Sequence, residues 1–171
     1  MNAAGYCSTY INNYFVWNSN GLHSSDSSSS AFIDGIFRTD TSAGSSHRGD
    51  QTLTSLEGST AGFEAAQLAT DSQNPVDIEP GKYEVVLGHE AVSTILVFLE
   101  VYGFNAKSKI DGMSPIIIGE QQFDEKINLV DTPEDPDSIG FKIDASGSKK
   151  LNLDVVSNGV PQSYFLSLIH I

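Results

Sequence analysis

The alternation of apolar and polar residues predicts strands in the first quarter of the chain. Residues 5–17 alternate loosely and are rich in Tyr, Thr, Ile, Phe and Val, which favour strands. The segment 18–21, Asn-Ser-Asn-Gly, predicts a turn, and residues 31–38 predict a further strand. Residues 24–30 are almost all serine, which suits either a linker or the polar face of a strand. We expect residues 47–50 to form a polar loop.

A helical pattern follows over residues 53–70. Its apolar members are Leu56, Phe63, Ala66 and Leu68. Three further alanines favour a helix, and residues 71–75, with a proline at the end, stop it. Because the stretch up to Pro80 is typical of a linker, we place a domain boundary between residues 78 and 79.

A short strand and a helix are predicted after this boundary. Residues 83–87 form a mainly apolar run that is typical of a buried strand. The helix that follows carries apolar residues at positions i, i+3, i+4 and i+7, namely Val92, Ile95, Leu96 and Leu99. More apolar residues widen this stripe, so we expect most of the helix to be buried. Gly103 predicts its end.

The remaining pattern predicts short strands, at residues 126–130, 141–144, 150–156 and 160–165. An Asn158-Gly159 pair between apolar runs is a strong hairpin signal. The predicted fold class is therefore α+β: a strand-rich first part, then a strand–helix entry and antiparallel hairpins.

Charge and cysteine content narrow the possible partners and the compartment. The net charge is -13, from 9 Lys+Arg and 22 Asp+Glu, so the surface repels nucleic acid and anionic membranes. Cys7 is the only cysteine, so no intramolecular disulfide or cysteine zinc cluster forms within the chain, and we interpret it as a small buried hydrophobe. No apolar run reaches the length of a membrane span, and we expect a cytoplasmic location.

The last residues differ in character from the rest of the chain. Residues 166–171, Leu-Ser-Leu-Ile-His-Ile, look like a translated sequencing adapter, and we predict that they are an artefact at the end of a truncated read. On this interpretation His170 is not a candidate ligand or base of the protein. The histidines left as candidate ligands or bases are His23, His47 and His89, of which we expect His47 to be solvated.

The residues at the predicted helix start indicate a metal site with one ligand missing. His89 and Glu90 match the first two positions of a zinc-peptidase motif, with the histidine as ligand and the glutamate as general base. No second histidine follows, because positions 93–95 are Ser, Thr and Ile. A helix-start histidine and a first-turn acid, favoured by the helix dipole, also have a plain structural explanation.

Several segments together resemble the TldD/PmbA (TldE) family of metallopeptidases. The most specific is the block 80–87, Pro-Gly-Lys-Tyr-Glu-Val-Val-Leu, followed by Glu-Ala-Val at 90–92. Asn-Ser-Asn-Gly at 18–21 resembles the family's Asn-Ser-x-Gly turn, and residues 141–147 and 158–160 resemble later family segments. The resemblance implies that residues 1–78 are the C-terminal part of a central domain. Residues 79–165 would begin the C-terminal domain.

The resemblance also implies a role. TldD-like members carry His-Glu-x-x-x-His and bind zinc, whereas PmbA-like members lack the motif and pair with a TldD-like subunit. Thr94 stands where the second histidine is expected. The chain is thus identified as a PmbA-like subunit that binds no zinc itself, partners a TldD-like subunit or a second copy, and acts on unfolded peptides.

Two alternatives remain open. The protein is a zinc peptidase in its own right if His89 and Glu90 act with ligands from beyond residue 165. It is a strand-rich binding module, unrelated to proteolysis, if the resemblance carries only the fold.

Overall fold

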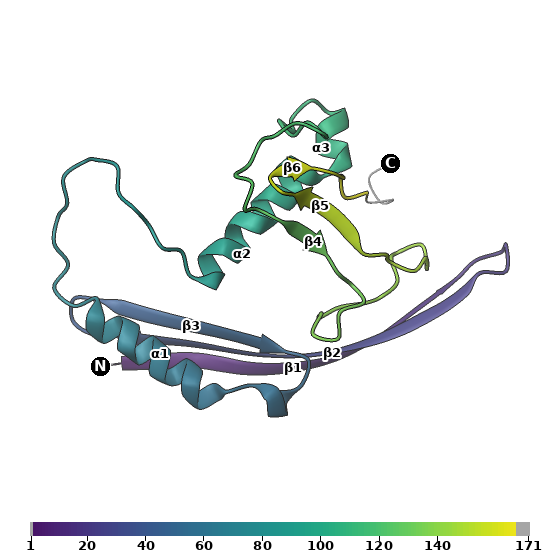
Figure 1. The fold of residues 1–171 in the computed structure, drawn as a ribbon. Coiled ribbons are helices and arrows are strands. Elements are labelled where there is room, and N and C mark those ends of the chain that lie inside the picture. Colours follow the sequence, from purple (N-terminus) through teal and green to yellow (C-terminus); the bar gives the residue numbers. More distant parts are fainter. Residues whose placement is uncertain (1, 167–171) are drawn as a thin grey trace. The chain divides into compact units, whose positions relative to one another are not determined.

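A computed structural model describes residues 2–166, and the fold is α+β as predicted. The chain divides into two compact units. The first comprises residues 2–14 and 27–85, and the second comprises residues 15–26 and 86–166. Figure 1 shows one group of strands, two of them long, with a helix, and another group of shorter strands with helices. Residues 167–171, which include His170 and most of the predicted adapter sequence, lie outside the described residues.

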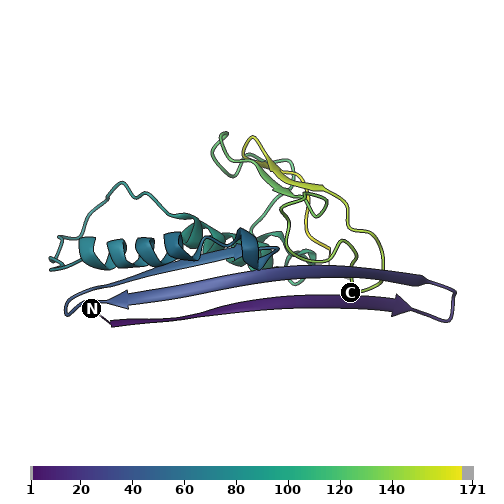
Figure 2. The same ribbon diagram turned by 90° about the horizontal axis from the view of Figure 1, so that it is seen from below.

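The first sheet has three strands in the order β1-β2-β3. These are β1 (Asn2–Trp17), β2 (His23–Arg38) and β3 (Ala43–Asp50). Figure 2 shows β1 and β2 side by side along their length. Residues 24–30 belong to β2, so the serine-rich segment is a strand and not a linker. Cys7, expected to be buried, is exposed on β1, an outer strand of the sheet.

The expected loop at residues 47–50 is instead the end of β3. This strand pairs antiparallel with β2, and the register sets His47 opposite Asp34. Its burial alternates strictly, but the inward positions Gly44 and Ser46 are small and not apolar. The sequence therefore lacks the apolar alternation by which a strand is recognised. The segment is a strand because it pairs with β2 through backbone hydrogen bonds.

Helix α1 (Gly58–Asp71) follows a short 3-10 turn, η1 (Leu53–Ser55). It buries an alanine stripe, made of Ala61, Ala65 and Ala69, while Phe63 and Leu68 stay 68% and 49% exposed. The buried face of the helix is therefore made of alanines and not of its large apolar residues. Gly44 of β3 has no side chain, so the helix backbone approaches the strand too closely for anything larger than alanine on its inner face.

The strand predicted just before the second helix is absent. Residues 83–87 form no strand, and Val86 is completely exposed. Helix α2 (His89–Phe98) has no buried residue and continues as a π-helical turn, η2 (Leu99–Phe104). The apolar pattern is present in the helix, but none of its residues is buried, and the extended segment belongs to neither of the described sheets.

The core of the second unit is formed by residues that follow α2 in the chain. Phe104, at the end of η2, packs with Ile116, Val155 and Val156, and all four are at most 4% exposed. Asn105 then caps helix α3 (Ala106–Ile110) by accepting a hydrogen bond from the Lys107 amide at 2.9 Å.

A small antiparallel sheet completes the second unit. Its strands are β4 (Leu129–Asp131), β5 (Leu153–Ser157) and β6 (Val160–Pro161), all shorter than predicted. The predicted hairpin at Asn158-Gly159 is confirmed, with positive φ of 47° and 77° at its two central residues. Residues 141–144 contribute only an isolated bridge, from Ile143 to Lys149. Among the described helices, none is long and apolar enough to cross a membrane.

Candidate functional site

The sequence-predicted metal residues lie at the start of α2. His89 is the first residue of the helix and is exposed, and Glu90, in the first turn, is half-buried. Gly88 precedes them with extended backbone and offers no side-chain cap. The helix dipole therefore faces an acid in its first turn, which is a favourable arrangement with or without a metal.

Thr94, at the position of the missing ligand, is held by its own helix. Its hydroxyl donates a hydrogen bond of 3.1 Å to the backbone carbonyl of Glu90, and the Ser93 hydroxyl donates to the same carbonyl at 2.8 Å. Such hydroxyls commonly bond back to the previous turn. Residues five apart also diverge by about 140° around a regular helix. Within residues 2–166, no three His, Cys, Asp or Glu side chains gather as a metal site would require.

The other two candidate histidines lie in strands of the first sheet. His23 begins β2 and is exposed. His47 is not simply solvated as expected: its Nδ1 lies 2.7 Å from Oδ1 of Asp34, its cross-strand neighbour. Because an ionised carboxylate only accepts, the histidine nitrogen donates. The ring of Phe32 stacks on His47, with centroids 5.9 Å apart.

Tyr6 of β1 completes a polar network with these residues. Burial of the Asp34 carboxyl opposes ionisation, but hydrogen bonds from His47 and Tyr6 and the charge of His47 outweigh it and lower the pKa of Asp34. The hydrogen bond to Asp34, followed by the charge of Asp34, raises the pKa of Tyr6. Three strands are thus tied together by one carboxylate. No sequence motif points to this network, because its three residues lie far apart in the chain.

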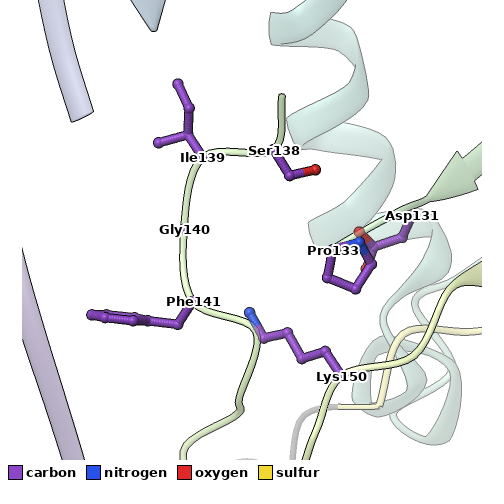
Figure 3. Close-up of a pocket in the computed structure, with 7 residues that line it drawn as sticks. All are labelled: Asp131, Pro133, Ser138, Ile139, Gly140, Phe141 and Lys150. Atoms are coloured by element: carbon purple, nitrogen blue, oxygen red, sulfur yellow. The ribbon is translucent and has the colours of Figure 1, made fainter. Parts of the chain in front are cut away.

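A pocket of about 160 Å³ lies in the second unit, beside the end of β4. It is lined by Asp131, Pro133, Ser138, Ile139, Gly140, Phe141 and Lys150 (Figure 3). We call it the Asp131–Lys150 pocket. Figure 3 shows the Lys150 side chain reaching across it toward the segment 138–141. Sequence reasoning did not find this site, because its residues come from a turn, a loop and a bridge that have no common motif.

Comparisons with known proteins place these features in a family of metallopeptidases. A family model described as the PmbA/TldA metallopeptidase C-terminal domain matches residues 80–170, more than half of the chain. The chain belongs to the PmbA/TldD family. Among curated proteins, no sequence matches it.

Two solved structures share the fold. A candidate modulator of a DNA gyrase from Thermotoga maritima superposes with a TM-score of 0.88 over 97% of this chain, at 20% identity. TldE from Thermococcus kodakarensis superposes with a TM-score of 0.72 over 94% of this chain, at 18% identity. The chain spans 40% and 38% of their respective lengths, about two fifths in each case.

The metal that the family description implies does not fit the residues of α2. A zinc site of this kind requires at least three protein ligands that converge on one point. Here His89 supplies one imidazole and Glu90 one carboxylate, while the Thr94 hydroxyl is directed at a backbone carbonyl. We therefore derive no reaction step through a metal at these residues.

Proposed function

We propose that this chain is part of a PmbA/TldE-like subunit in a two-subunit metallopeptidase, in which a TldD-like partner carries the zinc. The observation behind the proposal is Thr94, which occupies the place of the second histidine and donates its hydroxyl to Glu90 of the same helix. A neutral hydroxyl engaged in this way is a poor substitute for an imidazole. The fold similarity to TldE supports the same assignment.

The proposed role of this subunit is to help enclose an unfolded peptide. β1 and β3 are the outer strands of the three-stranded sheet, so each has one edge unpaired within the described residues. An extended peptide can add to such an edge through main-chain hydrogen bonds. A cytoplasmic location is part of the proposal, consistent with the single cysteine.

The domain assignment supports this placement within the longer protein. We assign residues 1–78 to the C-terminal part of a central domain and residues 79–165 to the beginning of the C-terminal domain. The match to the family's C-terminal domain starts at residue 80, next to the proposed boundary.

Co-expression tests the proposal directly. The full-length protein is purified alone and together with the TldD-like protein of the same genome, and zinc is measured per subunit by mass spectrometry. We expect a heterodimer on size-exclusion chromatography, one zinc per heterodimer, and peptidase activity in the complex only. Failure to associate would contradict the proposal.

His89→Ala separates this role from a zinc peptidase in its own right. We expect the variant complex to keep its zinc and nearly all of its activity, because an exposed helix-start histidine contributes little to stability. His23→Ala, another exposed histidine, is the matched control. If His89→Ala abolishes activity while His23→Ala does not, and the complex stays folded, His89 is a metal ligand and the non-catalytic assignment is wrong.

A further inference from the structure

The Asp131–Lys150 pocket contains two opposite charges that do not pair. Lys150 and Asp131 both line it, yet they form no ion pair with each other. Among the described residues, neither side chain has a hydrogen-bond or ion-pair partner. The charge of Lys150 acts at longer range on Asp144, as the smallest of the effects on that carboxyl.

Two neighbouring charged groups have partners within the protein. Lys149, the residue before Lys150, forms an ion pair with Glu134 at 2.5 Å. The Asp144 carboxyl accepts hydrogen bonds from Ser146 first and also from the Ser148 amide, which lower its pKa. Asp131 and Lys150, by contrast, line the pocket without such a partner among residues 2–166.

The walls of the pocket are held by hydrogen bonds. The Ser138 hydroxyl donates to the Thr132 carbonyl at 2.7 Å and ties the loop to the turn after β4. On the other side, the Lys150 amide donates to the Lys142 carbonyl at 2.8 Å. These bonds hold the backbone segments from which the exposed side chains of Asp131 and Lys150 extend.

The charge pattern selects the ligand class. An anion alone would meet Lys150 but be repelled by Asp131, and a cation alone would be repelled by Lys150. A ligand with both charges satisfies both side chains. The volume of about 160 Å³ is well below the roughly 300–1,000 Å³ of sites for drug-sized ligands, so the ligand is small.

We propose that the Asp131–Lys150 pocket binds a free α-amino acid, with its carboxylate on Lys150 and its ammonium on Asp131. Pro133 borders the pocket beside Asp131, and Gly140 leaves open space where a side chain would stand, which together suit a small aliphatic side chain. The proposal goes beyond the peptidase assignment and does not depend on it, because the pocket is formed by one unit of this chain.

Titration calorimetry on the full-length protein tests the ligand class. The probes are L-alanine, propionate, which lacks the ammonium, and ethylamine, which lacks the carboxylate. We expect L-alanine to bind saturably, and each single-charge probe to bind at least about tenfold more weakly, as for the loss of one charge-assisted hydrogen bond. Equal binding of propionate or ethylamine, or no saturable binding of L-alanine at millimolar concentration, would overturn the proposal.

Paired variants test the residues. Lys150→Met should weaken L-alanine binding about tenfold or more, while Lys149→Met, adjacent but outside the pocket, should leave it unchanged. Asp131→Asn should weaken binding, and Asp154→Asn, on the neighbouring strand, should not. Equal losses in Lys149→Met and Lys150→Met would refute the assignment.

A measurement on the unaltered protein avoids any dependence on variant folding. Amide chemical-shift changes on addition of L-alanine should concentrate at residues 138–141 and at Lys150. Shifts confined to other regions would place the ligand elsewhere and overturn the proposal.

Discussion

Replacing Gly44 with alanine tests the close approach of α1 to β3. A Cβ at this position would stand 2.3 Å from the Ala65 carbonyl oxygen, 2.4 Å from the Ala69 amide nitrogen and 2.7 Å from the Leu68 Cβ. Two of these atoms are helix backbone, so no side-chain rotation relieves the overlap. The helix must move away from the strand.

The expected loss follows from that displacement. Overpacking a well-packed contact costs about 1–3 kcal/mol. Moving α1 also stretches two links that join it to the sheet region. These are the ion pair between Arg48 and Glu64 and the hydrogen bond from the Ser42 hydroxyl to the Ala69 carbonyl. For a protein of this size the melting temperature should fall by roughly 2–12 °C.

Gly35→Ala is the matched control for this prediction. Gly35 lies in β2 of the same sheet, and a Cβ there meets nothing within 4 Å. Alanine in place of a strand glycine should be neutral or stabilising by up to about 1 kcal/mol. Thermal unfolding of both variants, followed by circular dichroism, gives the comparison. Equal melting temperatures for Gly44→Ala and Gly35→Ala would refute the packing argument.

Three further predictions concern the hairpin and the polar network. In Gly159→Ala, an alanine would adopt a φ of +77° and its Cβ would stand 2.3 Å from the side-chain amide nitrogen of Gln121. Thermal unfolding should show a loss of stability of about 2 kcal/mol or more. Gly119→Ala, with a φ of +84° but nothing near its Cβ, should lose less stability. The lowered pKa of Asp34 implies that its ionised carboxylate stabilises the folded state above the unfolded pKa near 3.9, and that this stability is lost as pH falls through the folded pKa. The free energy of unfolding measured in urea should therefore depend less on pH in Asp34→Asn than in the unaltered protein. The raised pKa of Tyr6 acts in the alkaline range, where folding stability is lost as pH rises above the unfolded pKa of about 10. In Tyr6→Phe the free energy of unfolding should fall less steeply with rising pH. The same pH dependence in Tyr6→Phe as in the unaltered protein would contradict the network.

The local sequence determined several features of this protein by itself. The Asn158-Gly159 turn was predictable because few residues adopt positive φ at both positions, and the two strands beside it are apolar. The start of α2 at residue 89 follows from periodicity, and the helical segment ends after Phe104, one residue beyond the predicted Gly103. The block at residues 80–87 indicated the family, and the model match that begins at residue 80 confirmed it.

Other features were decided by tertiary contacts. β3 is a strand because β2 offers a hydrogen-bonding partner, although its inward residues are glycine and serine. α1 turns its alanines inward because Gly44 sets the distance between helix and sheet, and this distance appears nowhere in the helix sequence.

The candidate sites divide in the same way. The sequence alone placed His89, Glu90 and Thr94 on one helix start, because residues close in sequence stay close in space. It did not bring together Tyr6, Asp34 and His47, or Asp131 and Lys150, since their spacing depends on strand register and loop closure. Local propensities decide which elements form, whereas long-range packing decides which side chains meet.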